Sequence, residues 1–346
     1  YVIDVGVEDP QNTALGELEL SNETLPKNSE LVVSTTISCI GKGGKRSVNL
    51  SIEDLDPSLP LVRTNKVLVP TSRLKDQRDI TLTENGSETV EFHIPGLELG
   101  TRHGKVTIVG EDALAVDNVR HFTIVVREPW PVLVVAPSDV DTDGFVEAIT
   151  PYEHRSEQRA RYDCMVISPP EISNHNLREF AAVVILDPPP LPITAWENLG
   201  KHVREGGQLA IFLGHNAETP SAFNSASAQE VLPGTLGRQY RVSGRDVYLA
   251  PHSYDHPIMT MFRPIASSVP WDRFPVFRYW DLRKSASQRQ VILRFGDNQP
   301  ALLERTVGKG TVLLMTTPIT ELDRPSGRQA WNELAGPEDW PRFILV

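Results

Sequence analysis

The sequence predicts two domains, an all-β sandwich over residues 1–128 and an α/β domain over residues 129–346. Three observations predict this division. The first part consists of short alternating apolar runs between turn residues, and the second part alternates continuous apolar runs with helix-like segments. Between them lies Glu128-Pro129-Trp130-Pro131, whose prolines stiffen the chain where the pattern changes. A chain of 346 residues is also longer than one ordinary core sustains.

Short runs with the alternation of half-buried strands fill the first part. They lie at 16–20, 30–40, 47–53, 61–69, 78–83, 88–94, 104–110 and 119–126. Strands at this spacing, with no helical period between them, are typical of an immunoglobulin-like (Ig-like) or fibronectin-like sandwich. Asn85-Gly86 predicts a hairpin turn, and the basic, glycine-rich segment 41–46 predicts a second, solvated one.

The second part begins with an apolar run at 132–136 that does not alternate, as in a strand buried on both faces of a parallel sheet. We expect further strands at 162–168, 182–187 and 208–213, and helices at 144–158, 173–181 and 194–204. Strands alternating with helices predict right-handed crossovers and a doubly wound, flavodoxin-like sheet.

Beyond about residue 236 the alternation of strand and helix ends. Strand-like runs follow at 239–248, 276–282, 291–296, 301–307 and 311–316, and Gly308-Lys309-Gly310 predicts a hairpin between the last two. The predicted fold is therefore an N-terminal all-β Ig-like sandwich followed by an α/β flavodoxin-like domain with β-rich additions.

The formal charge of −11 argues against a nucleic-acid partner or direct binding to an anionic membrane, because both need clustered lysine and arginine. Cys39 and Cys164 fall in different predicted domains, inside strand-like runs, so we expect neither a disulfide nor a cysteine metal cluster. The chain starts at Tyr1 and ends in an apolar segment, which leads us to expect a piece of a longer protein.

The strand at 208–213 runs into Gly214-His215-Asn216, a turn placed where nucleophile-bearing α/β enzymes carry Cys or Ser. This turn resembles the elbow of a class I glutamine amidotransferase-like domain whose thiol is missing. Such a site needs a thiolate nucleophile, a histidine base and an acid that orients the histidine. Because the elbow has neither Cys nor Ser, we predict no catalytic residue.

Further motifs, in their order along the chain, extend this resemblance. Trehalose-utilisation-type domains have landmarks similar to Gly206-Gly207, Gly214-His215, Asp255-His256-Pro257-Ile258 and 307–312. A closer resemblance is to the C-terminal part of aerotolerance-type (BatA-like) bacterial membrane proteins. It is carried by the segments 111–120, 131–135 and 300–305 and by Trp331-Asn332. That resemblance implies the sandwich and amidotransferase-like domains, flanking membrane helices, a von Willebrand A-type domain upstream and an extracytoplasmic, periplasmic-side location.

Ligands of doubly wound sheets bind beyond the carboxyl ends of the strands. By that rule one crevice is lined by Ser138, Asp139, Asp187, His215 and Asn216. Two interpretations of the histidine stay open. It binds a ligand or a metal, or its ring satisfies the loop backbone at the end of a strand.

Three other clusters have some resemblance to metal sites. His252 and His256 have an H-x3-H spacing, with Asp255 between them. The run D-x-D-x-D-G at 139–144 resembles the start of a calcium loop but has Thr150 at loop position twelve; we expect Asp143 to cap the next helix instead. The segment 111–118 is acidic and is either a calcium loop or a self-stabilising turn. We predict no metal and no cofactor.

These observations predict a non-catalytic, extracytoplasmic interaction module of a membrane-anchored bacterial protein. We expect a protein partner, with a small-molecule ligand as the lesser possibility, and membrane contact only through flanking segments. Trp271 and Phe274 are the expected exposed patch, and the tryptophans are otherwise expected to be spread through the core. The alternatives are a hydrolase or isomerase using His215 with Asp187 or Asp255, with or without a metal, and a carbohydrate-binding sandwich.

Overall fold

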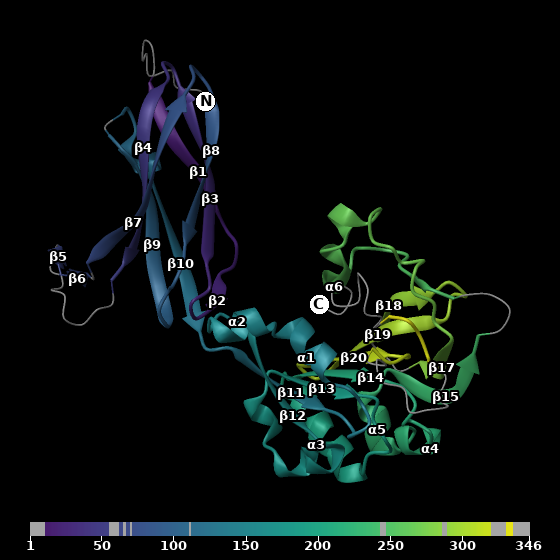
Figure 1. The fold of residues 1–346 in the computed structure, drawn as a ribbon. Helices are drawn as coiled ribbons and strands as arrows, with labels where there is room; N and C mark the ends of the chain where they lie inside the picture. The colour runs from purple at the N-terminus through teal and green to yellow at the C-terminus, as the bar shows by residue number, and fades with distance from the viewer. Residues whose placement is uncertain are drawn as a thin grey trace, which may run out of the picture. The chain divides into compact units, whose positions relative to one another are not determined.

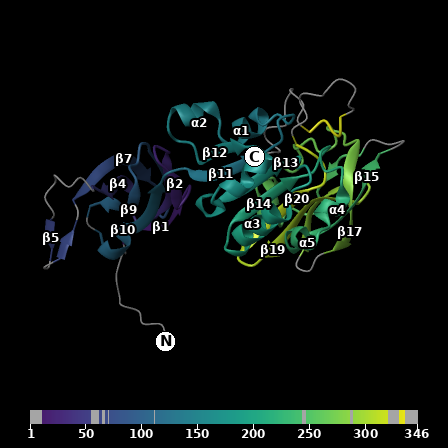
Figure 2. The same cartoon turned by 90° about the horizontal axis from the view of Figure 1, so that it is seen from below.

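The computed structural model describes residues 11–54, 62–64, 67–69, 71–110, 112–242, 247–285, 289–319 and 330–334. Strand predominates over helix, and the strands form several sheets (Figures 1 and 2). The chain divides into two compact units. The first unit comprises Tyr1–Pro129 and Glu153–Arg161, and the second comprises Trp130–Tyr152 and Tyr162–Val346.

The first unit is a sandwich of two antiparallel sheets. Its elements are β1 (Asn12–Leu20), β2 (Thr24–Pro26), β3 (Leu31–Ile40), β4 (Gly44–Glu53), β5 (Val62–Thr64), β6 (Val67–Val69), β7 (Ser72–Leu82), β8 (Ser87–Ile94), β9 (Gly100–Val109), the 3₁₀ turn η1 (Ala115–Asn118) and β10 (Val119–Arg127). One sheet has the order β1-β3-β8, and the other β2-β10-β9-β4-β7, where the short β2 pairs in parallel with β10. Alternate side chains of both sheets, such as Val33, Phe92, Val48 and Ile124, are buried in one core.

Two predicted hairpins of this unit are wrong. The segment 41–43 joins β3 to β4, and Asn85-Gly86 joins β7 to β8, but in both cases the two strands belong to different sheets. The two connections are bonded to each other, since Asn85 N–H donates to Gly41 O at 3.1 Å and Gly41 N–H donates to Asn85 Oδ1 at 2.9 Å. Asn-Gly chemistry favours the positive φ of 53° at Asn85, but it does not specify which sheet the next strand joins.

The second unit is built on one large sheet. Its elements in chain order are β11 (Trp130–Val135), α1 (Asp143–Ile149), α2 (Tyr152–Ser156), β12 (Tyr162–Ile167), η2 (Pro169–Asn174), η3 (Leu177–Glu179), β13 (Ala182–Leu186), α3 (Ile193–Arg204), β14 (Gln208–Phe212), α4 (Pro220–Phe223), α5 (Ala226–Val231), β15 (Gly234–Arg241), β16 (Leu249–Ala250), α6 (Pro257–Thr260), η4 (Arg263–Ile265), β17 (Arg278–Ser285), β18 (Arg289–Phe295), β19 (Pro300–Val307) and β20 (Gly310–Met315).

The large sheet has the order β12-β11-β13-β14-β20-β19-β18-β16. Its first five strands are parallel, and β19, β18 and β16 extend it as antiparallel strands. Helices α3 and α1 lie on opposite faces of this sheet (Figure 1). Trp196 of α3 and Phe145 of α1 pack into separate core clusters with the strands. The β-rich additions predicted from the sequence therefore continue the parallel sheet, whereas β15 and β17 form a separate antiparallel pair.

Several local predictions for this unit need correction. The helix expected at 144–158 is two helices, because Pro151 lacks an N–H and Thr150 before it leaves the helical region at φ −133°. The helix expected at 173–181 consists of 3₁₀ turns, and α4, α5 and α6 were not predicted. The hairpin between β19 and β20 is confirmed, with Val307 opposite Gly310 and Gly308 at φ 63°.

Within the described part of the chain, no helix has the length and apolar character needed to cross a membrane.

Candidate functional site

The candidate site lies at the carboxyl ends of three neighbouring parallel strands of the second unit. Asp139 follows β11, Asp187 follows β13, and His215 and Asn216 follow β14. Chain order reverses here, because β11 lies between β12 and β13. The edge at which the strand order reverses is where open α/β sheets bind their ligands.

Asp187 is the centre of this arrangement. Its backbone N–H donates to Phe212 O at 2.8 Å, and its side chain is buried, with 7% exposed. One carboxylate oxygen, Oδ1, accepts the backbone N–H of Asn216 at 2.8 Å, and the other, Oδ2, accepts Asn216 Nδ2 at 3.1 Å. Asn216 Nδ2 also reaches Asp139 Oδ1 at 3.5 Å, so Asn216 joins the two acidic residues.

The surroundings of Asp187 change its acidity. Burial, together with the smaller effect of the nearby Asp139 carboxylate, raises the pKa of its carboxyl group to about 6 against the lowering effects of the Asn216 hydrogen bond and His215. The backbone of Asp187 is also unusual, with a φ of 42°. A left-handed conformation at a residue other than glycine is a local strain of a kind that is common at functional sites.

Gly214 allows Asp187 to approach the turn after β14. A Cβ atom at position 214 would lie 2.6 Å from Asp187 Cγ, so any other residue there would displace the carboxylate. The carbonyl oxygen of Gly214 accepts a hydrogen bond from Trp280 Nε1 at 2.9 Å. The glycine is therefore required for close approach, while the indole holds the turn from the other side.

His215 is bonded to a second tryptophan. Trp331 Nε1 donates to His215 Nδ1 at 3.0 Å, and the two rings meet edge to face at 5.3 Å. Because Nδ1 accepts, a neutral His215 ring carries its proton on Nε2. One of its ring nitrogens is therefore bonded to an indole. The tryptophans are not all spread apart, because the ring centroids of Trp280 and Trp331 lie 6.0 Å from each other.

The structure thus brings together Asp139, Asp187, His215 and Asn216. The structure describes all five predicted residues. Ser138 is exposed, and it is the one residue of the five that makes no hydrogen bond to the other four. The sequence argument missed Trp280 and Trp331 because both lie far along the chain. The only signal in the sequence for either tryptophan was Trp331-Asn332, which is part of the BatA-like resemblance but to which no function was assigned.

The hydroxyl groups of Thr316 and Thr317 donate hydrogen bonds to the backbone, and the thiol group of Cys164 lies within a strand. Thr316 and Thr317, directly after β20, are fully buried; Thr316 Oγ1 donates to Pro300 O at 3.0 Å, and Thr317 Oγ1 donates to Arg278 O at 3.0 Å. Cys164 lies in the middle of β12, opposite Val132, and is partly buried against a core cluster. Both cysteines are free thiols.

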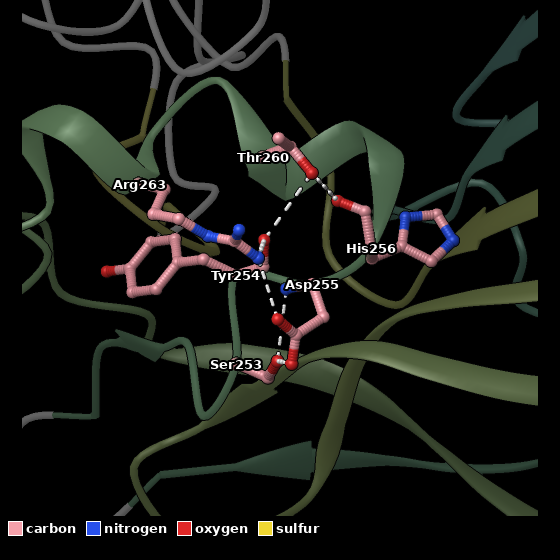
Figure 3. Close-up of polar contacts among 6 residues, drawn as sticks. All are labelled: Ser253, Tyr254, Asp255, His256, Thr260 and Arg263. Atoms are coloured by element: carbon pink, nitrogen blue, oxygen red, sulfur yellow. Dashed lines mark hydrogen bonds and ion pairs between the residues drawn. The ribbon is translucent and has the colours of Figure 1, made fainter. Parts of the chain in front are cut away.

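The two histidines before α6 have separate partners and do not form a metal pair. His256 caps the helix: its Nδ1 accepts Ile258 N–H at 3.3 Å and its Nε2 lies 3.2 Å from Glu304 Oε2, while His252 Nδ1 bonds Ala250 O at 2.9 Å. In Figure 3 the His256 ring points away from the ion pair of Asp255 with Arg263, which measures 2.7 Å. Among the described residues no group of three His, Cys, Asp or Glu side chains could hold a metal.

Two further predictions are wrong. Asp143 does not cap α1; instead Asp143 N–H donates to Asp141 Oδ1 at 2.9 Å, and the cap residue Thr142 makes no side-chain cap bond. Trp271 and Phe274 are not an exposed patch. Both are partly buried against a core cluster, and Trp271 Nε1 donates to Tyr254 Oη at 3.1 Å.

A cavity of about 150 Å³ also lies in the second unit, between the sheet and the α6 region. Its lining is apolar, and none of the five predicted residues lines it. The lining residues are Ile211, Phe212, Leu249, Ile258, Met259, Phe262, Trp271, Leu293, Leu302, Leu313, Met315, Ile319 and Leu334.

Comparisons with known proteins identify no family. No family model matches the chain, and no curated protein matches it either. Among solved structures, a cytoplasmic protein of Salmonella typhimurium is similar at 14% identity and a TM-score of 0.41, over 62% of this chain and 95% of that one.

Two other solved structures are similar over shorter stretches. A Listeria innocua β-glucosidase has 19% identity and a TM-score of 0.25, over 34% of this chain and 16% of its own length. The CARDB domain of a Pyrococcus furiosus protein has 12% identity and a TM-score of 0.27, over 37% of this chain and all of that domain. At TM-scores this low, these similarities support no conclusion about the fold or function of this chain.

Proposed function

We propose that this chain is a non-catalytic, extracytoplasmic interaction module of a membrane-anchored bacterial protein. In this proposal the first unit is an Ig-like sandwich and the second is a degenerate class I glutamine amidotransferase-like domain. The five parallel strands have the chain order 2-1-3-4-5, which supports a flavodoxin-like topology. Location and tethering rest on the resemblance to aerotolerance-type membrane proteins.

The observation that carries the proposal is the bonding of the elbow residues within the fold. A general base must direct its accepting nitrogen at a substrate proton. His215 Nδ1 instead accepts the indole N–H of Trp331, and Asn216 donates its backbone N–H and its Nδ2 group to Asp187. These bonds support a turn that holds its own shape. We infer that such a rigid turn helps to present a surface to a protein partner, with a small-molecule ligand as the alternative.

An activity assay tests the non-catalytic part of the proposal. The purified chain would be incubated with glutamine, a p-nitrophenyl ester and a p-nitroanilide, beside a matched His215→Ala variant. We expect no turnover above buffer for either protein. Turnover by the unaltered chain that disappears in the variant would overturn the proposal.

Protease accessibility tests the location. The full-length protein would be expressed in its bacterial host, and spheroplasts would be treated with a protease that does not cross the inner membrane. Digestion of this segment is expected while a cytoplasmic marker stays intact. A segment protected until the inner membrane is lysed would contradict an extracytoplasmic location.

The second candidate is a hydrolase or isomerase, which Asp187 itself favours. A carboxyl group with a pKa of about 6 lies close to the value an acid–base catalyst needs, and the strained φ of 42° is also common at active sites. In this alternative Asp187 transfers the proton and the Nε2 side of His215 faces the substrate. Activity with an inflection near pH 6 that is lost in Asp187→Asn would favour it, as would stoichiometric metal in the purified protein.

A further inference from the structure

A polar cluster in the first unit joins the start of β1 to the connection between β9 and β10. Asn12 is the first residue of β1, Asp112 lies shortly after β9, and Asp117 and Asn118 end η1. Asn12 Nδ2 donates to Asp117 Oδ2 at 2.8 Å, and Asn118 Nδ2 donates to Asp112 Oδ1 at 2.9 Å. Asp112 Oδ2 also accepts the backbone N–H of Thr13 at 3.0 Å, so the two parts of the cluster are tied together.

Three oxygen atoms of this cluster are buried and have no hydrogen-bond partner. They are the Oδ1 atoms of Asn12, Asp117 and Asn118. Asn118 as a whole is 4% exposed. Each of these oxygens belongs to a side-chain group whose other polar atom is bonded inside the cluster. A buried acceptor without a partner is costly, and three from neighbouring side chains point to a missing ligand.

Turning the amide groups does not remove these unpartnered oxygens. The NH₂ groups of Asn12 and Asn118 face the carboxylates of Asp117 and Asp112, and an ionised carboxylate only accepts hydrogen bonds. If either amide were reversed, its oxygen would face a carboxylate oxygen. The present orientation is therefore the favoured one, and the three acceptors need a ligand from outside the cluster.

The chemistry of the cluster selects a hard cation. Neither Asp112 nor Asp117 forms an ion pair with a lysine or arginine among the described residues, so two negative charges lack a cationic partner there. A water molecule donates only two hydrogen bonds and brings no charge. An all-oxygen set of carboxylates and amides suits calcium or magnesium rather than zinc, which prefers nitrogen and sulfur.

We propose that this cluster is a calcium site. Asn12 Oδ1, Asp117 Oδ1 and Asn118 Oδ1 are the side-chain ligands, and Asp112 supplies the second negative charge. Calcium fits better than magnesium, because it accepts irregular oxygen sets, whereas magnesium requires near-octahedral geometry and releases its waters reluctantly. Two of the four side chains are asparagines, so the site is distinct from a trio of His, Cys, Asp or Glu residues. Bound calcium clamps β1 to the β9–β10 connection.

Calorimetry on the whole chain tests this site. After removal of divalent ions with a chelator, titration with CaCl₂ is expected to give one bound ion per chain, and differential scanning calorimetry is expected to show a higher Tm with CaCl₂ than with NaCl of equal ionic strength. Asp117→Asn keeps the shape of the side chain but removes a charge, so we expect at least about tenfold weaker calcium binding. Asp79→Asn, which alters a carboxylate on β7 bonded to Ser47, is the matched control and should bind as the unaltered chain does.

Three results would overturn the proposal: no heat of calcium binding at millimolar concentration, unchanged binding by Asp117→Asn, or tighter binding of magnesium than of calcium. The Tm of each variant without metal shows whether it is folded. Asn12→Ala, at the partly exposed start of β1, is the second variant, and it should also weaken calcium binding. Its binding decides the question if Asp117→Asn does not fold.

Discussion

At the level of single residues, the candidate site depends on a carboxyl group that the fold removes from water. Asp187 is predicted from the sequence as a residue at the end of a strand, but its pKa of about 6 depends on burial beside Asp139. Its carboxylate accepts two hydrogen bonds from Asn216, 29 residues away. Neither the burial nor the bonding is encoded next to Asp187 in the sequence.

The stability of the second unit should decrease as pH rises from about 4 to about 6. The folded state holds the Asp187 proton up to a pKa of about 6, whereas the unfolded chain releases it near 3.8, so the folded state binds more protons in this window. The free energy of unfolding should fall by up to about 3 kcal/mol across it. All six tryptophans lie at or beyond residue 130, so urea unfolding followed by tryptophan fluorescence reports on this unit.

The matched variant for this prediction is Asp187→Asn, which does not titrate. The unfolding free energy of the unaltered chain minus that of Asp187→Asn should therefore fall as pH rises from about 4 to about 6. Glu171→Gln, in the same unit, serves as a control with the opposite sign, because hydrogen bonds from Ser168 lower the pKa of Glu171. Identical pH profiles of the unaltered chain and Asp187→Asn would show that the Asp187 pKa is not raised by folding.

Gly214→Ala should destabilise the second unit by about 1–3 kcal/mol, because the added methyl group would overlap the Asp187 carboxylate at 2.6 Å. Gly296→Ala is the control: its added Cβ would meet only Tyr248 O, at 3.9 Å, so the change should stay within about 0.5 kcal/mol. Urea unfolding of both variants measures the difference. Equal effects would mean that the turn moves freely away from Asp187.

At the level of elements, the sequence located most strands but misassigned two pairings in the first unit. The alternating runs match β3, β4, β8 and β10 closely, because a strand with one buried face shows a period of two wherever it pairs. Pairing is a different matter. The turns after β3 and β7 connect opposite sheets, although their glycine and asparagine residues are also those of hairpins. Helix ends likewise depended on single residues, as Pro151 shows between α1 and α2.

Asn85→Ala should destabilise the first unit more than Asn85→Gly does. Alanine loses the bond from Gly41 N–H and also disfavours the φ of 53°, whereas glycine loses only the bond. We expect about 2 kcal/mol for alanine and about 1 kcal/mol for glycine. Hydrogen exchange of the β3, β7 and β8 amides measures both effects. Equal losses would show that the side-chain bond alone matters.

At the level of the whole molecule, the chain combines two separately cored units. The core of the first lies between its two sheets, and the clusters of the second lie on the two faces of its mixed sheet. The antiparallel strands β19, β18 and β16 extend the parallel strands that carry the candidate site. Trp331 and Trp280, which bond the turn after β14, come from the later part of the chain.

The net charge of the whole chain leads to a prediction about partners. With a formal charge of −11, the chain should bind neither duplex DNA nor vesicles rich in anionic lipid at about 0.15 M salt. Electrophoretic mobility shift and vesicle flotation measure this, with a basic protein as the positive control. A salt-sensitive shift with either ligand would reveal a local basic surface that the net charge conceals.

The sequence by itself determined the alternation of strands, the change of pattern at residues 128–131 and the polar residues that follow the parallel strands. These features are local, since hydrophobic period and turn chemistry act over a few residues. Only the tertiary structure decided which sheet each sandwich strand joins, that two distant indoles hold the turn at His215, and that Asp187 is buried beside Asn216. These outcomes depend on contacts between residues far apart in the chain, and no short segment contains the information that sets them.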